Sequence, residues 1–159
     1  MIRRISPFQA ILFLAICAAS GCGGSQGNRD DSPRGVVNGK LVDNNKPFAL
    51  DASKVPVPKG ARSLPPGVSG ALSIVFISSD TKESYTADVN ADAGTFQVKG
   101  IDGKGIKAGR YRIAVTGRMG ISPDTPDYFG GKFTPEKTQI LRDVKAGDEV
   151  VIDVAKPQG

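Results

Sequence analysis

Apolar and polar residues alternate in seven short runs between residues 35 and 156. An alternation of period two is typical of β-strands that bury one face, and no helical period appears in this part of the chain. The 20 glycines and 11 prolines among 159 residues supply the turns between the runs. We therefore predict an all-β domain of seven strands. The runs cover residues 37–41, 71–78, 85–90, 95–99, 110–116, 140–144 and 150–154.

Seven strands with one apolar face each are most simply buried by two sheets packed face to face. We predict an antiparallel Greek-key β-sandwich over residues 35–156, with a closed barrel as the alternative.

Two segments interrupt the strand spacing. Residues 48–70 are rich in proline and predict an irregular excursion over the surface, because proline cannot donate to a strand ladder. Residues 117–133 predict a long loop.

The chain contains no histidine, no tryptophan and only two cysteines, Cys17 and Cys22. Catalytic triads, histidine-ligated zinc and two-histidine iron sites all require histidine. Both cysteines precede the predicted β domain, which therefore has no thiol for catalysis, metal binding or an internal disulfide. We predict a protein that is not an enzyme and that uses no cofactor and no metal. A hydrolase that uses carboxylates alone stays open, since the chain has 16 acidic residues.

The first 22 residues have three parts. Arg3 and Arg4 are basic, residues 8–19 are apolar, and three small residues precede Cys22. This order is typical of an export signal, and the apolar part is too short to span a bilayer as a helix. The small residues before the cysteine are Ala19, Ser20 and Gly21.

The sequence Ala19-Ser20-Gly21-Cys22 resembles the lipobox of bacterial lipoproteins. The resemblance implies that residues 1–21 are a removable signal peptide and that Cys22 receives the lipid. Cys17 is a poorer candidate, because the β-branched Ile16 precedes it. An uncleaved anchor and a secreted protein with an incidental cysteine are the alternatives.

Residues 22–34 are polar and glycine-rich and predict a flexible tether between the anchor and the β domain. Stable anchoring requires more than one acyl chain, as a mature lipoprotein carries. Gly23, rather than aspartate, follows the anchor. We therefore expect a lipid-anchored protein of the cell envelope, at the outer membrane rather than the inner one.

Two stretches share the order glycine, any residue, aromatic, any residue, aliphatic. The glycine and aromatic residues are Gly94 with Phe96 and Gly109 with Tyr111. Over residues 35–155 the chain resembles carboxypeptidase regulatory-like domains, which have a transthyretin-like β-sandwich fold. The resemblance implies that each glycine adopts a positive φ before its strand and that each aromatic points into the core. Two enzyme families that share this general sandwich, the transthyretin-related hydrolases of the purine pathway and the intradiol dioxygenases, depend on histidine, which this chain lacks.

Tyr128 and Phe129 lie between Pro126 and Gly130 in the predicted long loop. Exposed aromatic pairs on loops are common contact residues in protein interfaces. The alternative is that both rings fold back and cap one end of the sandwich.

The net charge and its distribution limit which classes of molecule this protein is expected to bind. The formal charge is +5, and Arg3 and Arg4 leave with the signal peptide. The remaining basic residues stand singly and without interleaved aromatics, so we expect no nucleic-acid partner. We predict a structural or binding role, with the membrane as one partner through the anchor and an envelope protein or a polysaccharide as another. A protein that binds a small apolar ligand between its sheets is the alternative, and it requires an internal cavity.

Residues 88–94 resemble a calcium loop but lack the glycine and glutamate positions of an EF-hand, because Ala93 and Lys99 stand there. We expect a hairpin turn in which Asn and Asp side chains bond their own backbone. Calorimetry with millimolar calcium is expected to show no binding. A clear exotherm that is lost in Asp92→Ala would contradict this interpretation.

Overall fold

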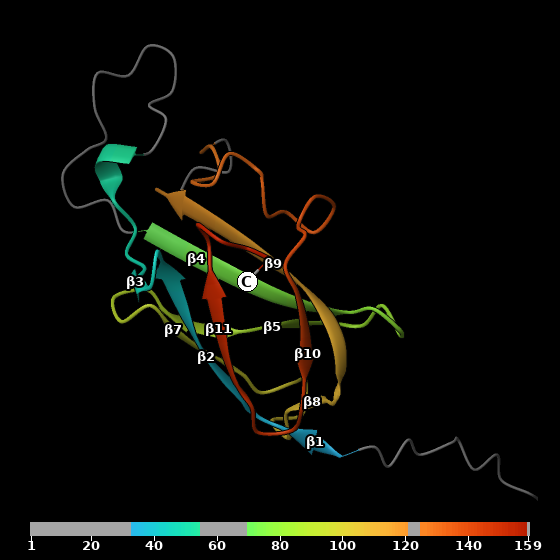
Figure 1. The fold of residues 1–159 in the computed structure, drawn as a ribbon. Helices are drawn as coiled ribbons and strands as arrows, with labels where there is room; N and C mark the ends of the chain where they lie inside the picture. The colour runs from blue at the N-terminus through green and yellow to red at the C-terminus, as the bar shows by residue number, and fades with distance from the viewer. Residues whose placement is uncertain (1–32, 55–69, 121–124, 159) are drawn as a thin grey trace, which may run out of the picture. The chain divides into compact units, whose positions relative to one another are not determined.

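The computed structural model describes residues 33–54, 70–120 and 125–158 (Figure 1). The chain divides into two compact units, Met1–Asp31 and Ser32–Gly159, and the described residues all belong to the second. The predicted signal peptide, its lipobox, Cys22 and most of the tether lie outside the described residues. Residues 55–69 of the predicted proline-rich excursion also lie outside them.

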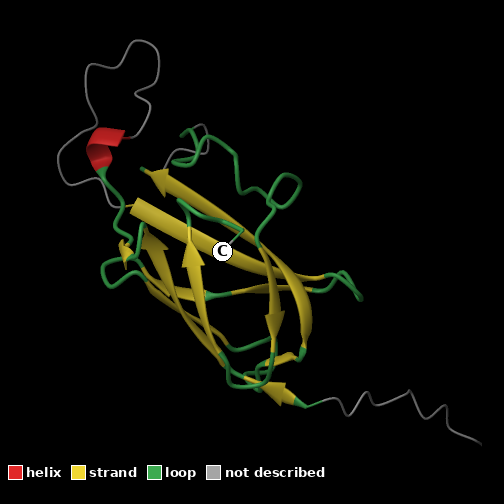
Figure 2. Ribbon diagram, viewed as in Figure 1, coloured by secondary structure: helices red, strands yellow, loops and turns green. Residues whose placement is uncertain are grey.

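The second unit is an all-β domain with several sheets (Figure 2). Within the described ranges the chain forms no α-helix, and its one helical turn is the 3₁₀ helix η1, Ala52–Lys54. All seven predicted runs lie on strands. The strands are β1 Arg34–Gly35, β2 Val37–Asp43, β3 Lys46–Pro47, β4 Gly70–Ser78, β5 Ser84–Thr86, β6 Asp88–Asn90, β7 Thr95–Val98, β8 Ile106–Lys107, β9 Gly109–Met119, β10 Leu141–Val144 and β11 Glu149–Asp153.

The described residues thus form eleven strands rather than the predicted seven. Three of the additional strands, β1, β3 and β8, have two residues each, which is too short for a period-two pattern. The fourth arises because the predicted run 85–90 divides at Ala87. Its first part, β5, pairs with β4, and its second part, β6, pairs with β7 in another sheet. The Ala87 amide donates to the carbonyl of Ile74 at the crossing (2.9 Å).

One sheet has the order β10-β9-β4-β5, and all its pairs are antiparallel. A second sheet has the order β11-β2-β7-β6, with β3 paired to β2 (Figure 1). Here β11 runs parallel to β2, so the prediction of an entirely antiparallel fold is wrong. Almost the whole domain separates these two strands in sequence, so no hairpin turn fixes their relative direction. A small third sheet joins β1 to β8.

The two large sheets bury their apolar residues in one common core. Phe76 of β4 lies at its centre, and its ring contacts Phe96 of β7 at 5.9 Å and Tyr111 of β9 at 6.1 Å. A core shared by two sheets is consistent with a β-sandwich. The fully buried strand residues of this core are Val37, Leu41, Ile74, Phe76, Val98, Ile106, Ile113, Val115, Val144 and Ile152.

Two loop predictions need correction at their ends. Phe48, predicted to begin a surface excursion, is only 4% exposed, and its amide donates to the carbonyl of Leu41 (2.9 Å). A large aromatic ring stabilises the folded state more when it is buried in the core than when it is exposed at the surface. This explains why the chain turns inward at Phe48. The predicted loop 117–133 begins later, because Gly117 and Met119 still belong to β9.

The two signature glycines differ in conformation. Gly94 has a φ of 62°, as expected, and a Cβ there would lie 2.9 Å from the carbonyl oxygen of Phe48. Gly109 has no positive φ, so that expectation is wrong for it. It is the first residue of β9 and pairs with Val144, which requires ordinary extended backbone. Both signature aromatics, Phe96 and Tyr111, are buried as expected.

This difference predicts opposite outcomes for two matched substitutions. Gly94→Ala should lower the free energy of unfolding by about 1–3 kcal/mol, because alanine is strained at positive φ. Gly109→Ala should change it by less than about 0.5 kcal/mol, since the added methyl group meets only ordinary contacts. Denaturant unfolding of both variants measures this, and equal losses would contradict the assignment.

Candidate functional site

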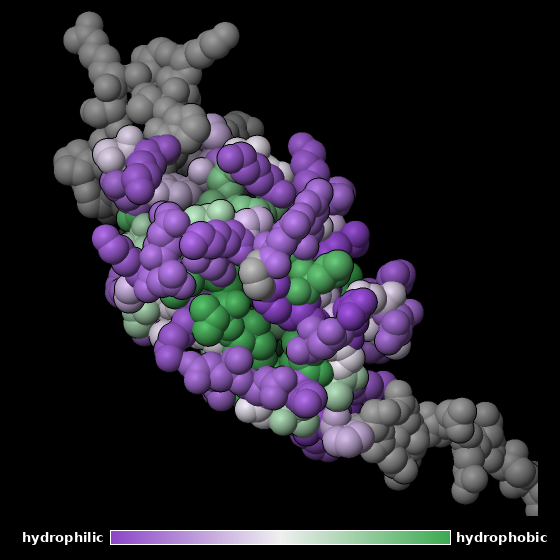
Figure 3. Space-filling model, viewed as in Figure 1, coloured by the Kyte–Doolittle hydropathy of each residue, from purple (hydrophilic) through white to green (hydrophobic). Residues whose placement is uncertain are grey.

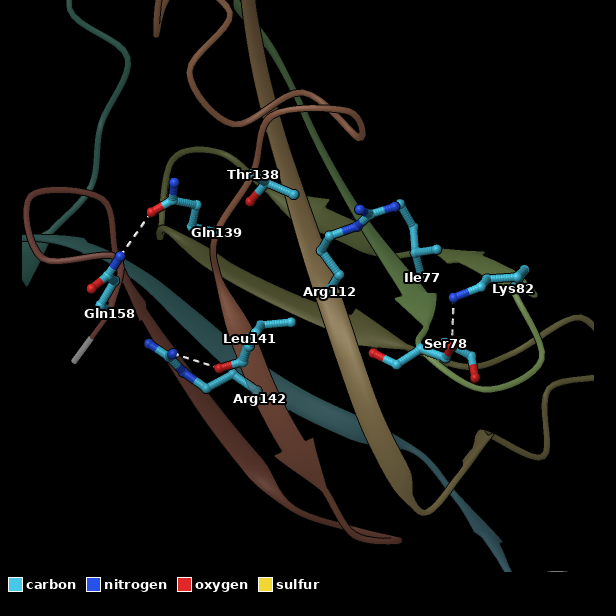
Figure 4. Close-up of a pocket in the computed structure, with 10 residues that line it drawn as sticks. Ile77, Ser78, Lys82, Arg112, Thr138, Gln139, Leu141, Arg142 and Gln158 are labelled. Carbon is cyan, nitrogen blue, oxygen red and sulfur yellow. Dashed lines mark hydrogen bonds between the residues drawn. The ribbon is translucent and has the colours of Figure 1, made fainter.

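A groove of about 610 Å³ lies on the outer face of the four-stranded sheet (Figure 4). A row of three residues on neighbouring strands crosses it: Ile77 of β4, Arg112 of β9 and Leu141 of β10. On β9 the flanking residues Tyr111 and Ile113 are buried in the core, so alternation along the strand directs Arg112 outward. The same alternation that builds the core therefore builds the groove.

Three cationic side chains line the groove, and no aspartate or glutamate does. Figure 4 shows Arg142 on one side, Lys82 on the other and Arg112 between them. In the part of the chain that the structure describes, the guanidinium of Arg112 has no hydrogen-bond or ion-pair partner. The groove therefore has a positive potential that attracts anions.

The other two cations are positioned by backbone carbonyls. Arg142 Nη1 donates to the carbonyl of Leu141 at 2.8 Å and to that of Pro157 at 3.5 Å. Lys82 Nζ donates to the carbonyl of Ser79 at 2.6 Å. A guanidinium has five N–H donors and an ammonium three, so both groups keep donors for a ligand.

Lys82 also has a strained backbone. Its φ is 63°, and its amide donates to the carbonyl of Ser78 (3.2 Å) in the turn between β4 and β5. Left-handed backbone costs a residue other than glycine about 1 kcal/mol or more, and such strain is frequent at functional sites. The turn thus holds a lysine at the groove where glycine fits the backbone better.

Two acidic residues adjoin the lining in sequence: Asp80 lies between Ser79 and Lys82, and Asp143 lies two positions after Leu141 on β10. Arg110 binds Asp143 with two hydrogen bonds, from Nε at 2.9 Å and from Nη2 at 3.0 Å. These bonds lower the pKa of the Asp143 carboxyl, and the carboxylate in turn raises the pKa of Arg110. Because Asp143 already has a cationic partner, it does little to neutralise the groove.

Neutral polar groups complete the groove. The side-chain amides of Gln139 and Gln158 bond each other at 2.8 Å, and Ser79 adds a hydroxyl. The hydroxyl of Thr138 already donates to the carbonyl of Ile113 at 2.6 Å, so its proton serves the fold rather than a ligand. On the face that Figure 3 presents, hydrophobic surface lies in the middle of the domain and hydrophilic side chains surround it.

The lining contains no carboxylate and no thiol, and the whole chain has no imidazole. These groups supply most general bases and nucleophiles of enzymes. What the groove offers is charge-assisted hydrogen bonding, which is strongest toward carboxylate, sulfate or phosphate oxygens. Its chemistry is that of anion binding.

A second cavity of about 340 Å³ lies on the outer face of the five-stranded sheet. Its charges are balanced, because Lys40 pairs with Glu149 at 2.6 Å. At its other side Asp88 pairs with Lys99 at 2.9 Å. This cavity therefore has no net attraction for a charged ligand, and the groove over the four-stranded sheet is the better candidate.

The residues that the sequence singled out lie away from this groove. Phe96 and Tyr111 meet at Phe76 in the core, so they have a structural role. Asn90 Oδ1 accepts the amide of Ala93 at 3.1 Å, which is the predicted turn chemistry of residues 88–94. Among the described residues, no group of three or more acidic, cysteine or histidine side chains could hold a metal ion.

Tyr128 and Phe129 are partly buried and pack against the core. Their rings lie 5.7 Å and 5.4 Å from the ring of Phe48, and Phe129 also contacts Phe133 at 5.4 Å. Asp127 fixes the loop, since its carboxylate accepts the amides of Gly117 (2.9 Å) and Gly131 (2.8 Å). These are the contacts expected of the capping alternative.

The three groove cations were missed because they are far apart in sequence and look like isolated basic residues. The available signal was Arg112, which stands between two apolar residues on a strand and must face outward. The pairing of β9 with both β4 and β10 brings the ends of these strands together, so that Lys82 and Arg142 line the same groove as Arg112.

Comparison with known proteins gives no identity: no protein family, curated protein or solved structure matches this chain. In the described ranges, no helix has the length and apolar character needed to cross a membrane.

The aromatic contacts yield a stability prediction. Replacing Tyr128 and Phe129 together by alanine should lower the free energy of unfolding by about 2–4 kcal/mol, because the cap over Phe48 is lost. The control is Ile101→Ala, since this side chain is 92% exposed and should contribute little. Thermal unfolding measures both. Unchanged stability of the double variant, with loss of a binding partner, would instead support the contact-surface alternative.

Proposed function

We propose that this protein is an exported lipoprotein of the cell envelope whose β domain is a non-enzymatic binding module. Residues 1–21 serve as the signal peptide, Cys22 carries the acyl chains, and residues 22–34 form the tether. The outer membrane is favoured over the inner one, because Gly23 rather than aspartate follows the anchor. The sequence Ala19-Ser20-Gly21-Cys22 supports the anchor.

The observation that carries the binding role is the groove over β4, β9 and β10. It combines three cations, neutral hydrogen-bonding groups and aliphatic side chains, and it has no carboxylate of its own. Its volume lies in the range of about 300–1,000 Å³ that is usual for small-molecule sites. The groove and the second cavity both open on outer faces of the sheets. The missing carboxylates in the lining of the groove disfavour a carboxylate hydrolase.

We further propose that the domain is a Greek-key sandwich of the transthyretin-like type. Two observations support this assignment. The two large sheets share one core, and the aromatics of both signature stretches, Phe96 and Tyr111, contact the same ring of Phe76. In this proposal the signature serves to join the sheets rather than to bind a partner.

Substituting the two cysteines one at a time tests the anchor. Cys22→Ser should incorporate no labelled palmitate and should keep its signal peptide, because the hydroxyl is not an acceptor for the lipid. Cys17→Ser is the matched control, and it should be labelled and processed like the unaltered protein. Palmitate labelling and mass spectrometry of the N-terminus measure both outcomes. Normal labelling of Cys22→Ser, or loss of labelling in Cys17→Ser, would contradict the assignment.

A further inference from the structure

We propose that the groove binds an acidic oligosaccharide, a short glycan that carries carboxylate groups. This inference rests on the proposed role of the domain as a binding module and names the class of its ligand. Three properties of the lining support it: unpaired positive charge, neutral hydrogen-bonding groups and aliphatic surface. Each property matches a different part of such a glycan.

The positive charge matches the carboxylates. Arg112 is at the centre of the groove, on the middle strand of three, and has no partner among the described residues. A guanidinium binds a carboxylate through two parallel hydrogen bonds, so Arg112 is suited to hold one directly. Lys82 and Arg142 lie on opposite sides of it (Figure 4) and extend the positive potential along the groove. Three cations in one groove repel one another, and an anionic ligand offsets this repulsion.

The neutral groups match the hydroxyls of a sugar. The amides of Gln139 and Gln158 each carry both donors and acceptors, and the mutual bond at 2.8 Å uses only one donor and one acceptor. The Ser79 hydroxyl also donates and accepts. A ligand that carries only anionic oxygens needs donors alone, whereas sugar hydroxyls need both kinds of group. The lining therefore fits a ligand richer in hydroxyls than a simple anion.

The aliphatic residues match the carbon face of a sugar ring. Ile77 and Leu141 flank Arg112 in the cross-strand row, and Leu141 is 49% exposed although it is large and apolar. Neighbouring strands lie about 4.8 Å apart, so this row extends over about 10 Å. Covering Leu141 removes apolar surface from water, which favours binding.

An acidic peptide fits this surface less well. Extended peptides commonly bind by adding a strand to an exposed sheet edge, through backbone hydrogen bonds. The edge strand here is β10, and Arg142 already donates to the carbonyl of Leu141 on it. A membrane of anionic lipids also fits less well, because a flat array of headgroups cannot fill a groove as a single chain can.

Calorimetry on the full chain, purified as it matures in cells, tests the ligand class. The probe is tetragalacturonate, and its fully methyl-esterified form is the neutral control. We expect tetragalacturonate to bind with a dissociation constant below 1 mM, which is about the limit of a specific weak complex. The esterified form should bind at least ten times more weakly. Absence of binding by tetragalacturonate at millimolar concentration would overturn the proposal.

Variants locate the site. Arg112→Gln should weaken binding at least tenfold, whereas Arg118→Gln, which removes the same charge from the same strand outside the lining, should leave it unchanged. Lys82→Gly should weaken binding severalfold while the melting temperature stays equal or rises, because glycine relieves the positive φ. Equal losses in Arg112→Gln and Arg118→Gln would overturn the assignment to this groove.

Two further probes separate other ligands. Hexaglutamate carries carboxylates without hydroxyls, and vesicles of phosphatidylglycerol present anionic headgroups. If either binds as tightly as tetragalacturonate and loses binding in Arg112→Gln, the groove serves that ligand and the glycan proposal fails, while the binding role stands. Palmitate labelling of the cysteine variants is independent of all these outcomes, so the anchor is judged separately.

Discussion

The contact of Phe76 with both Phe96 and Tyr111 joins the two large sheets, and the rest of the domain depends on this shared core. Both cysteines precede residue 23, so no disulfide links the sheets. Burial of a large apolar side chain contributes about 1.5–3 kcal/mol. A domain of this size reaches ordinary stability from many such contributions, because the entropy of ordering the chain opposes nearly all of them.

The core also determines where ligands can bind. On β9, Tyr111 and Ile113 face inward and are almost fully buried, which fixes the outward direction of Arg112 between them. A slip of one residue in the pairing of β9 would bury the guanidinium and expose the aromatic ring, at a large cost in free energy. The central row of the groove therefore lies on three paired strands, and its central cation is held in place by the packing beneath it, while Lys82 and the two glutamines come from a turn and loops.

Local patterns in the sequence were sufficient for the seven predicted runs, which all lie on strands, but insufficient for the two-residue strands β1, β3 and β8 and for the pairing of the strands. The run 110–116 predicted β9 correctly because its alternation is continuous. The parallel pairing of β11 with β2 and the change of sheet at Ala87 were not predicted, since both depend on contacts between distant parts of the chain. The groove was missed for the same reason. Lys82 and Arg142 are sixty positions apart in the sequence. The burial of Phe96 and Tyr111 was easier to predict, because the glycine-aromatic signature that contains them is local in the sequence.

The central claim is that the outer face of the four-stranded sheet, fixed by the core beneath it, is the binding surface of this protein. Nuclear magnetic resonance spectra of the nitrogen-15-labelled protein during a titration with tetragalacturonate test it most directly. The account predicts that the largest shifts occur at the amides of residues 77–82, 112 and 139–142. Larger shifts at Asn38, Lys40 and Gln97 on the opposite face, or at Tyr128 and Phe129, would contradict it.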